Sequence, residues 1–325
     1  MIKIKKTFEK ILFWLNCARL YSAPITILSW LVIFIYSIKD GGNIFNGLLA
    51  LIGICLVHLA TNLIDDYIDY KELSKDKEFI KAGRDHKCDY LRKNLATVKD
   101  LKNVIIIMLL IAAVIGGILF LLSGPAVILF ACIGLLIALA YPKFSMNGLG
   151  EVLVIIAYGP LLFAGVYYVM TKDFSFNVIL LSFACVMFVN SILYAHMLMD
   201  FDGDKKANKK TLCLILKTKQ NALNLIIIFF AISYALIGYI AYQSLNNLFF
   251  LTYITIPMVI ELYISLDLFN KNPQSLPNNP FWNHPLDNWN KIKDTYNAPF
   301  YSRFYMVRNI TTYFMLLTCI AIIFG

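Results

Sequence analysis

Charge is scarce in this sequence. Asp, Glu, Lys and Arg make up only 15% of the 325 residues, whereas an ordinary soluble domain has about 25%. Hydrophobic residues reach 59%. An α-helix needs about 20 mostly apolar residues to cross a bilayer, and uncharged stretches of that order recur along the chain. The composition therefore excludes an ordinary soluble domain and predicts an all-α polytopic membrane protein. The uncharged stretches cover residues 20–38, 41–64, 103–142, 174–199 and 220–260.

Several functional signatures are missing as well. The seven cysteines are odd in number, scattered and without a CxxC pair, which argues against a disulfide framework and against a zinc site. GxSxG, P-loop and HExxH motifs are absent, so hydrolase and ATPase functions have no motif to support them. The formal charge is +9, but the basic residues lie in short segments between apolar spans. We therefore predict contact with membrane lipid and no nucleic-acid partner.

Charges and turn residues divide the apolar stretches into nine predicted helices. The uncharged run 103–142 is too long for one span, and Ser123-Gly124-Pro125 supplies a turn inside it, as residues 243–247 do in the run 220–260. Lysines precede the first run as in a signal peptide, but Arg19 interrupts it, which favours an uncleaved span. We predict a single transmembrane domain over residues 1–325, with helices near 11–38, 42–70, 97–122, 125–141, 148–170, 174–199, 221–242, 246–270 and 298–324.

The distribution of Lys and Arg predicts an orientation for these spans. With the N-terminus in the cytoplasm, 27 of the 29 basic residues fall on the cytoplasmic side, and only Lys39 and Lys172 fall outside. The positive-inside rule therefore predicts a protein integral to the cell (inner) membrane with a cytoplasmic N-terminus. The inner segment 271–297 is rich in Pro, Asn and Trp, which favours an interfacial loop over a substrate lid.

Acidic residues gather where the second predicted helix ends. Asn62, Asp66 and Asp69 are spaced as i, i+4 and i+7, so they share one helical face, and Asp65 lies beside that face. We call residues 62–70 the first Asp motif.

The sixth predicted helix runs into a similar cluster. Asp200, Asp204 and Asn208 repeat at intervals of four, and we call residues 200–208 the second Asp motif. Four spans separate the two motifs, and this even number places both on the predicted cytoplasmic side. The alternative interpretation is that these acids are ordinary loop residues just past the helix ends. For Asp65 and Asp202 this alternative and a functional role are equally supported.

Carboxylates gathered in this way repel one another unless a cation lies between them. Mg²⁺ is the natural candidate, because it is commonly held by one or two carboxylates together with substrate phosphates. A diphosphate bound through Mg²⁺ becomes a good leaving group, since the metal neutralises its developing charge. His58 and His196 each lie four residues before a motif member and on the motif's face. His58 is more simply explained as a packed polar residue, whereas for His196 packing and function are equally good explanations.

With these motifs the sequence resembles the UbiA superfamily of intramembrane aromatic prenyltransferases. The runs Asn62-Leu-Ile-Asp-Asp66-Tyr-Ile-Asp69 and Asp200-Phe-Asp-Gly-Asp204 are most similar to the branch containing 1,4-dihydroxy-2-naphthoate polyprenyltransferase. Gly148-Leu-Gly-Glu151 through Gly159-Pro160 to Tyr167-Tyr168 is also similar to that branch. The resemblance covers nearly the whole chain in span order.

The resemblance implies a Mg²⁺-dependent enzyme that transfers a polyprenyl group from polyprenyl diphosphate to an aromatic acceptor, with the prenyl chain in a groove open to lipid. The implied acceptor is 1,4-dihydroxy-2-naphthoate, in menaquinone biosynthesis. The implied metal ligands are Asn62, Asp66, Asp69, Asp200 and Asp204, and the four aspartates are the implied catalytic residues. No obligate protein partner is inferred. The residues expected to bind diphosphate or substrate are Arg19, Asp65, Tyr70, Lys81, Arg84, Tyr141, Lys143, His196 and Asn208, with Arg303 and Arg308 as further basic residues within reach.

Two alternatives stay open beside this interpretation. For each basic residue, a positive-inside or snorkelling charge explains its position equally well. Tyr70, His196 and Met199 depart from the residues usual in the family, and they lie beside the expected acceptor pocket. Related reactions on the same scaffold therefore compete: transfer to another aromatic, a glycerol phosphate or a tetrapyrrole acceptor, or a terpene cyclisation. A cation-coupled transporter is disfavoured, since neither inverted repeats nor broken helices near the midplane are evident.

Overall fold

A computed structural model describes residues 2–73, 88–145, 147–206, 210–277 and 289–325. Within these ranges nine helical segments are long and apolar enough to cross a membrane, which confirms the predicted number of spans. They are η1 with α2 (Leu20–Ser22 and Ala23–Lys39), α3 (Ile44–Leu73), α5 (Val98–Ser123), α6 (Ala126–Ser145), α7 with η3 and α8 (Gly150–Ile156, Ala157–Leu161 and Leu162–Thr171), α9 (Phe176–Met199), α12 (Lys219–Ser244), η4 with α13 (Asn247–Thr255 and Ile256–Lys271), and α15 (Ala298–Phe324).

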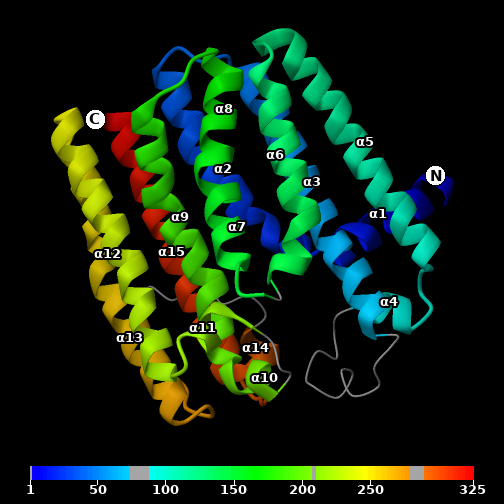
Figure 1. Cartoon of the computed structure of the whole chain (residues 1–325), viewed down its shortest axis with the longest axis vertical. Helices are drawn as coiled ribbons and strands as arrows, with labels where there is room; N and C mark the ends of the chain where they lie inside the picture. Colours follow the sequence, from blue (N-terminus) through cyan, green and yellow to red (C-terminus); the bar gives the residue numbers. More distant parts are fainter. Residues whose placement is uncertain (1, 74–87, 146, 207–209, 278–288) are drawn as a thin grey trace.

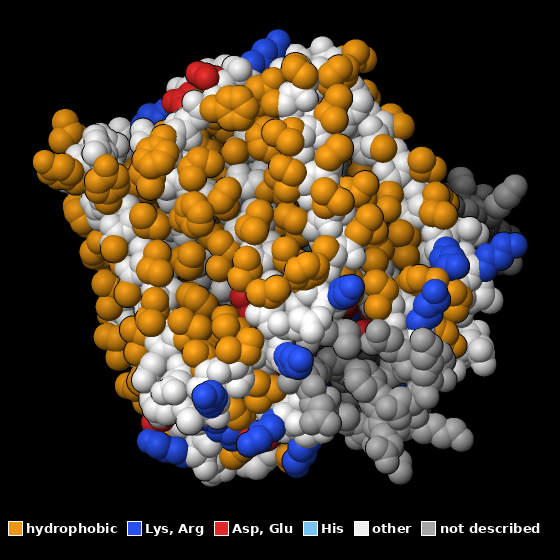
Figure 2. All heavy atoms as spheres, viewed as in Figure 1, with side chains coloured by type: hydrophobic (Ala, Val, Ile, Leu, Met, Phe, Trp, Pro, Cys, Tyr) orange, Lys and Arg blue, Asp and Glu red, His pale blue; other side chains and the backbone are white. Residues whose placement is uncertain are grey.

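The long helices stand side by side, with α12 and α13 at one edge of the bundle and α5 at the other (Figure 1). Short helices lie at the lower end of the same view: α4 (Asp89–Arg92), α10 (Phe201–Lys206), α11 (Leu212–Ile215) and α14 (Trp289–Ile292). Apolar side chains cover most of one face, while Lys and Arg gather mainly toward its lower and right-hand edges (Figure 2). This division suits a protein whose long helices face lipid and whose loops face water.

The core is centred on α9, the most buried of the nine spans. Phe188 of α9 stacks on Phe314 of α15 with 3.8 Å between ring centroids. A second, smaller cluster joins α1 (Ile2–Cys17) and α4 to α3 and α5, and Trp14 meets Tyr90 edge to face in it at 5.9 Å. This smaller cluster holds the end of α3 that carries the first Asp motif, because Leu63 and Ile64 of α3 are buried in it.

The first predicted helix, residues 11–38, is wrong in one respect: the structure divides it at Arg19. Helix α1 ends at Cys17, and α2 begins at Ala23 after the short 3-10 turn η1. Arg19 itself takes a left-handed conformation with φ 60° and ψ 51°. Pro24 lies in the first turn of α2, where proline is tolerated because that N–H has no partner within the helix. The break turns α1 away from α2 (Figure 1).

The fifth span is interrupted by a wider turn near its middle, so the expectation that no helix is broken there is wrong. Residues Ala157–Leu161 form the π-helical segment η3 between α7 and α8, and Gly159 has non-helical angles of φ −96° and ψ −111°. Pro160 lacks an N–H, so the regular helical ladder cannot continue through it. A Cβ on Gly159 would lie 3.0 Å from Cγ1 of Val186, so glycine permits the close approach to α9. Such π-turns are frequent at functional sites.

Arg303 of α15 is fully buried and joins α15 to the end of α13 and the loop that follows. Its guanidinium donates to the carbonyl oxygens of Ser265, Ser275 and Pro299 at 2.7–2.9 Å, and it lies over the ring of Phe269 at 5.0 Å. Arg303 is absent from the cavity described below. The suggestion that it reaches a diphosphate is therefore wrong, because its donors are spent on carbonyl groups.

Arg303→Met is expected to destabilise the protein by about 3 kcal/mol or more, because three buried carbonyl groups lose their donor while apolar volume is largely kept. Thermal unfolding of the detergent-solubilised protein measures this. Lys271→Ala removes an exposed pair with Asp267 and should change stability by about 0.5 kcal/mol or less. Equal effects of the two substitutions would contradict the role given to Arg303.

Candidate active site

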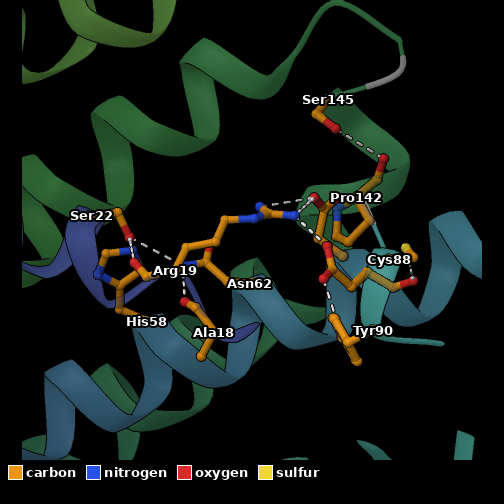
Figure 3. Close-up of polar contacts among 11 residues, drawn as sticks. Ala18, Arg19, Ser22, His58, Asn62, Cys88, Tyr90, Pro142 and Ser145 are labelled. Atoms are coloured by element: carbon orange, nitrogen blue, oxygen red, sulfur yellow. Dashed lines mark hydrogen bonds and ion pairs between the residues drawn. The ribbon is translucent and has the colours of Figure 1, made fainter. Parts of the chain in front are cut away.

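Arg19 lies between the two consecutive aspartates of the first Asp motif. Its guanidinium donates to Oδ2 of Asp65 at 3.4 Å and to Oδ1 of Asp66 (Figure 3). Burial alone would lower the pKa of Arg19, but the Asp66 and Asp65 carboxylates outweigh it and raise the pKa. The guanidinium is therefore protonated at any physiological pH. The break after α1 is what brings this side chain to the end of α3.

Asp66 is a buried carboxylate that is held by side chains from other segments. Its side chain is 4% exposed, and besides the bond from Arg19 it accepts a hydrogen bond at 3.2 Å from the phenol of Tyr90 in α4. The thiol of Cys88 donates to the Asp66 backbone carbonyl at 3.2 Å. Burial, followed by the nearby Asp66 charge, raises the pKa of Tyr90, so this phenol remains a donor. Arg19 and Tyr90, from two other segments of the chain, therefore fix the orientation of one buried carboxylate.

Tyr90→Phe is expected to lower stability by about 1–2 kcal/mol, because Asp66 loses a charge-assisted hydrogen bond while the ring contact with Trp14 is kept. Thermal unfolding in detergent measures the change. Tyr296→Phe, at a tyrosine that is 81% exposed, is the matched control and should leave stability unchanged. A Tyr90→Phe protein as stable as the wild type would show that the phenol does not hold Asp66.

A chain of polar side chains extends from Asn62 toward the interior of the bundle. The amide Nδ2 of Asn62 donates to the Ala18 carbonyl at 2.9 Å and to Ser22 Oγ at 3.2 Å. Ser22 Oγ also lies 3.1 Å from Nε2 of His58 (Figure 3). Nδ1 of His58 lies 2.6 Å from Thr26 Oγ1, which in turn lies 3.2 Å from the phenol of Tyr158.

One cavity of about 2,010 Å³ contains both the aspartate end and this polar chain. Among the predicted site residues, Arg19, Asn62, Asp65, Asp66, Tyr141 and His196 line it. Much of its remaining wall is apolar and comes from α3, α5, α6 and α8, whereas α15 contributes aromatic side chains and Arg308. The cavity therefore joins a charged end to a long hydrocarbon-like space, as a ligand with a charged head and an apolar tail requires. Apolar examples are Leu109, Leu110, Phe120, Phe130 and Leu135.

The second Asp motif lies at the end of α9. His196 pairs with Asp200 through Nδ1 and Oδ2 at 3.4 Å, and its ring meets Phe300 of α15 edge to face at 5.0 Å. Asp204 is buried, while Asp202 is paired with Lys219 at 2.5 Å. His196 is the member of this group that lines the cavity. It is the contact between the cavity and the second motif.

The remaining predicted residues are less central. Asp69 is buried and Tyr70 is half-buried against the smaller core cluster, and neither lines the cavity. Lys143 is exposed at the end of α6. Asp200 and Asp204 also lie outside the cavity lining. Three predicted residues, Lys81, Arg84 and Asn208, lie outside the described residues.

Four residues of the site were not predicted. Ser22, Thr26, Tyr90 and Tyr158 all line the cavity, and all bond to another residue of the site. Ser22 ends η1 and Thr26 lies in the first turn of α2, directly after the break at Arg19, and that break was not predicted. Tyr158 stands beside the Gly159-Pro160 pair, a dipeptide of the kind that marks turns and helix breaks, and this signal was not used.

The comparison with known protein families shows which family this chain belongs to. Residues 22–284 match the family described as "UbiA prenyltransferase family". The chain belongs to the UbiA prenyltransferase family. It is therefore an integral membrane protein and a prenyltransferase. Among curated UbiA-family proteins, 1,4-dihydroxy-2-naphthoate octaprenyltransferase from Haemophilus influenzae is 26% identical over 219 residues, which are 63% of this chain and 70% of the relative.

Solved UbiA-type structures share the fold. A UbiA homolog from Aeropyrum pernix K1 has a TM-score of 0.59 at 16% identity, over 88% of this chain and 96% of that one. A UbiA homolog from Archaeoglobus fulgidus bound to GPP and Mg²⁺ has a TM-score of 0.58 at 14% identity, over 95% and 99%. A digeranylgeranylglyceryl phosphate synthase has a TM-score of 0.58 at 17% identity, over 96% and 99%. At these identities the likeness establishes the fold.

The UbiA-type site suits a divalent metal whose coordination shell is completed by oxygen atoms of the substrate. Within the described part of the chain, no three His, Cys, Asp or Glu side chains form a ready-made metal site. Mg²⁺ needs only one or two carboxylates when phosphate oxygens supply further ligands. Asp65 and Asp66 are adjacent carboxylates at the cavity's charged end, and Asn62 adds an amide oxygen beside them. This donor set of hard oxygen atoms fits Mg²⁺ and diphosphate together.

Proposed function

We propose that this UbiA-family enzyme transfers a polyprenyl group from polyprenyl diphosphate to 1,4-dihydroxy-2-naphthoate, with Mg²⁺ as cofactor. One observation carries the proposal: Arg19, Asp65 and Asp66 meet at the charged end of a large cavity whose other walls are largely apolar. A prenyl diphosphate has the same two parts, an anionic head and a hydrocarbon chain. The naphthoate acceptor is supported by the curated relative's name and by the motif runs that resemble its branch.

The residues at the charged end have different roles toward the diphosphate: some would hold Mg²⁺, and Arg19 would contact phosphate oxygens. Asp65 and Asp66, with Asn62 beside them, would hold Mg²⁺, and the second Asp motif would hold a further ion. Mg²⁺ supplies neutralisation of the charge that develops on the departing diphosphate. The guanidinium of Arg19 is fixed beside the same carboxylates, and its remaining N–H groups would donate to phosphate oxygens. Because Arg19 is fixed before substrate arrives, little reorganisation is needed when the bond breaks.

The reaction follows from this arrangement. The allylic carbon–oxygen bond breaks with its electron pair on the diphosphate, and an electron-rich carbon of the acceptor ring supplies the pair for the new carbon–carbon bond. Holding the two reacting atoms about 3–3.5 Å apart contributes much of the rate. The largely apolar walls exclude water, which would otherwise capture the allylic centre.

We also propose that the N-terminus and both Asp motifs face the cytoplasm of the cell. Support comes from the basic residues, 27 of 29 of which belong to the N-terminal segment, the segments beside the motifs and the other inner loops. The water-soluble diphosphate would then leave from the charged end of the cavity into the cytoplasm. The prenyl chain would stay in the apolar part, beside the membrane lipid.

The test uses the purified full-length protein in lipid nanodiscs with Mg²⁺, a radiolabelled polyprenyl diphosphate and 1,4-dihydroxy-2-naphthoate. The proposal expects a prenylated naphthoquinol, which EDTA abolishes and added Mg²⁺ restores. Product formation that survives EDTA would contradict the metal–diphosphate part. Product formed only with 4-hydroxybenzoate or a glycerol phosphate would keep the donor half and replace the acceptor.

A further inference from the structure

The Arg19 carbonyl, at one end of the hydrogen-bonded chain from Ser22 to Tyr158, determines which group donates in each hydrogen bond of that chain. Ser22 Oγ donates its single proton to the Arg19 carbonyl at 2.8 Å. It can therefore only accept from its two other neighbours, Asn62 Nδ2 and His58 Nε2. His58 consequently carries its proton on Nε2. The tautomer of the imidazole follows from counting donors around one hydroxyl.

The same assignment of donors and acceptors extends to Nδ1, the other ring nitrogen of His58. In a neutral imidazole protonated on Nε2, Nδ1 of His58 accepts, so Thr26 Oγ1 donates to it across 2.6 Å. The only proton of Thr26 is then spent, and Thr26 must accept from the phenol of Tyr158 across 3.2 Å. Each proton in this series points from Tyr158 toward His58. Tyr158 therefore keeps its oxygen lone pairs for an additional donor.

The position of this hydrogen-bonded chain limits what that additional donor can be. On α3, His58 lies one turn from Asn62, and Asn62 lies one turn from Asp66, so the chain starts beside the charged end. Ser22, Thr26, His58 and Tyr158 all line the cavity. The prenyl chain is hydrocarbon and has no use for these polar groups. The wider turn η3, which contains Tyr158, places this phenol opposite α2 and α3.

We propose that Tyr158 binds a ring hydroxyl of the aromatic acceptor, and that Thr26 and His58 are positioning residues that take up its proton as the ring attacks. This inference rests on the proposed prenyl transfer. The hydroxyl proton passes to Tyr158 as the proton of Tyr158 passes to Thr26 and that of Thr26 to Nδ1 of His58. The allylic carbon–oxygen bond breaks onto diphosphate, the new carbon–carbon bond forms, and the ring becomes a ketone beside an imidazolium.

The same hydrogen-bonded side chains also allow the acceptor ring to become aromatic again. When the attacked carbon loses its proton to the diphosphate, or loses its carboxylate as CO₂, the electron pair of that bond returns to the ring. The ketone oxygen then takes a proton back from the chain, and His58 ends neutral. No oxidant or reductant is needed. The substrate class is thereby narrowed to aromatic rings with a free hydroxyl next to the carbon that is prenylated.

The test compares Tyr158→Phe with the wild type in the same nanodisc assay. The substitution keeps the ring that meets His58 edge to face and removes only the oxygen. We expect kcat/KM for 1,4-dihydroxy-2-naphthoate to fall about 100-fold, with KM for polyprenyl diphosphate within about twofold. Tyr167→Phe is the matched control, because Tyr167 lies on the same span, donates one hydrogen bond to Asp40 and does not line the cavity. It should retain wild-type kinetics.

The two monomethyl ethers of 1,4-dihydroxy-2-naphthoate show whether a substrate hydroxyl is the partner. As competitive inhibitors, one of them should bind the wild type and Tyr158→Phe equally well, because its hydroxyl contact is already lost. The relay is tested by Thr26, for which Thr26→Ser should retain kcat and the similarly sized Thr26→Val should lower it about 100-fold.

Three results would overturn the inference: unchanged acceptor kinetics in Tyr158→Phe, weaker binding of both ethers by that variant, or equal activity of Thr26→Ser and Thr26→Val. Failure of the proposed function gives a different pattern. In that case the wild type itself transfers no prenyl group to a hydroxylated ring, although it binds prenyl diphosphate with Mg²⁺.

Discussion

Asp66→Asn is expected to lower kcat/KM for prenyl transfer about 10²- to 10³-fold, the loss typical when one group that stabilises developing charge is removed. Asparagine has nearly the shape of aspartate and keeps one oxygen for Tyr90, so the packing around α4 is preserved. It removes the negative charge that holds Arg19 and that would bind Mg²⁺. Steady-state kinetics in nanodiscs measure the effect at several Mg²⁺ concentrations.

The control for this substitution is Asp267→Asn. Asp267 also pairs with a basic residue, Lys271 at 2.6 Å, but it lies on α13 and outside the cavity. Wild-type kinetics are expected there. A requirement for more Mg²⁺ in Asp66→Asn would identify the lost metal contact. Wild-type activity in Asp66→Asn would instead contradict the assignment of the diphosphate to this end of the cavity.

Arg19→Ala is expected to lower kcat/KM about 10²-fold or more, and Arg19→Lys about 10-fold. The guanidinium contacts two carboxylates at once, whereas an ammonium group is a point charge that cannot bridge them in the same geometry. Much of the loss should appear in KM for polyprenyl diphosphate, because the contact proposed for Arg19 is with the diphosphate head and not with the acceptor. Initial rates over a matrix of both substrates separate the two KM values.

Arg92→Lys is the matched exchange for Arg19→Lys. Arg92 also pairs with an aspartate, Asp89, but this pair lies within the short helix α4 and Arg92 does not line the cavity. Near wild-type kinetics are expected. If Arg19→Lys behaved in the same way, a positive charge alone would suffice at this position. The left-handed backbone at position 19 is equally strained with Arg or Lys there, so strain does not distinguish Arg19→Lys from the wild type.

Span number and span order followed from the sequence because hydropathy is a local property. Uncharged runs, together with the turn at Ser123-Gly124-Pro125, gave all nine spans found in the described part of the chain. In the structure, Gly124 indeed takes a positive φ of 107° after α5. The break at Arg19 was missed because apolar residues lie on both sides of this single charge and no glycine or asparagine marks the left-handed residue. Pro24 was the available signal.

Local spacing predicted half of the candidate site. The i, i+4 relation placed His58 on the face of Asn62, and both line the cavity. Contacts between distant segments were out of reach of spacing: Arg19 meets Asp66 across 47 positions, and Tyr90 meets it across 24. The partner of Arg19 is set by the turn after α1, and that of Tyr90 by the smaller core cluster. Neither packing arrangement leaves a periodic pattern.

The direct test of the central claim is a structure of the protein with a non-reactive polyprenyl thiolodiphosphate and Mn²⁺ in place of Mg²⁺. Anomalous scattering locates Mn²⁺ independently of the surrounding density. We predict Mn²⁺ beside Asp66, a diphosphate contacted by Arg19, and a prenyl chain along the apolar walls of α5 and α6. A diphosphate bound away from Arg19 and Asp66, or bound with no metal beside either Asp motif, would contradict the account.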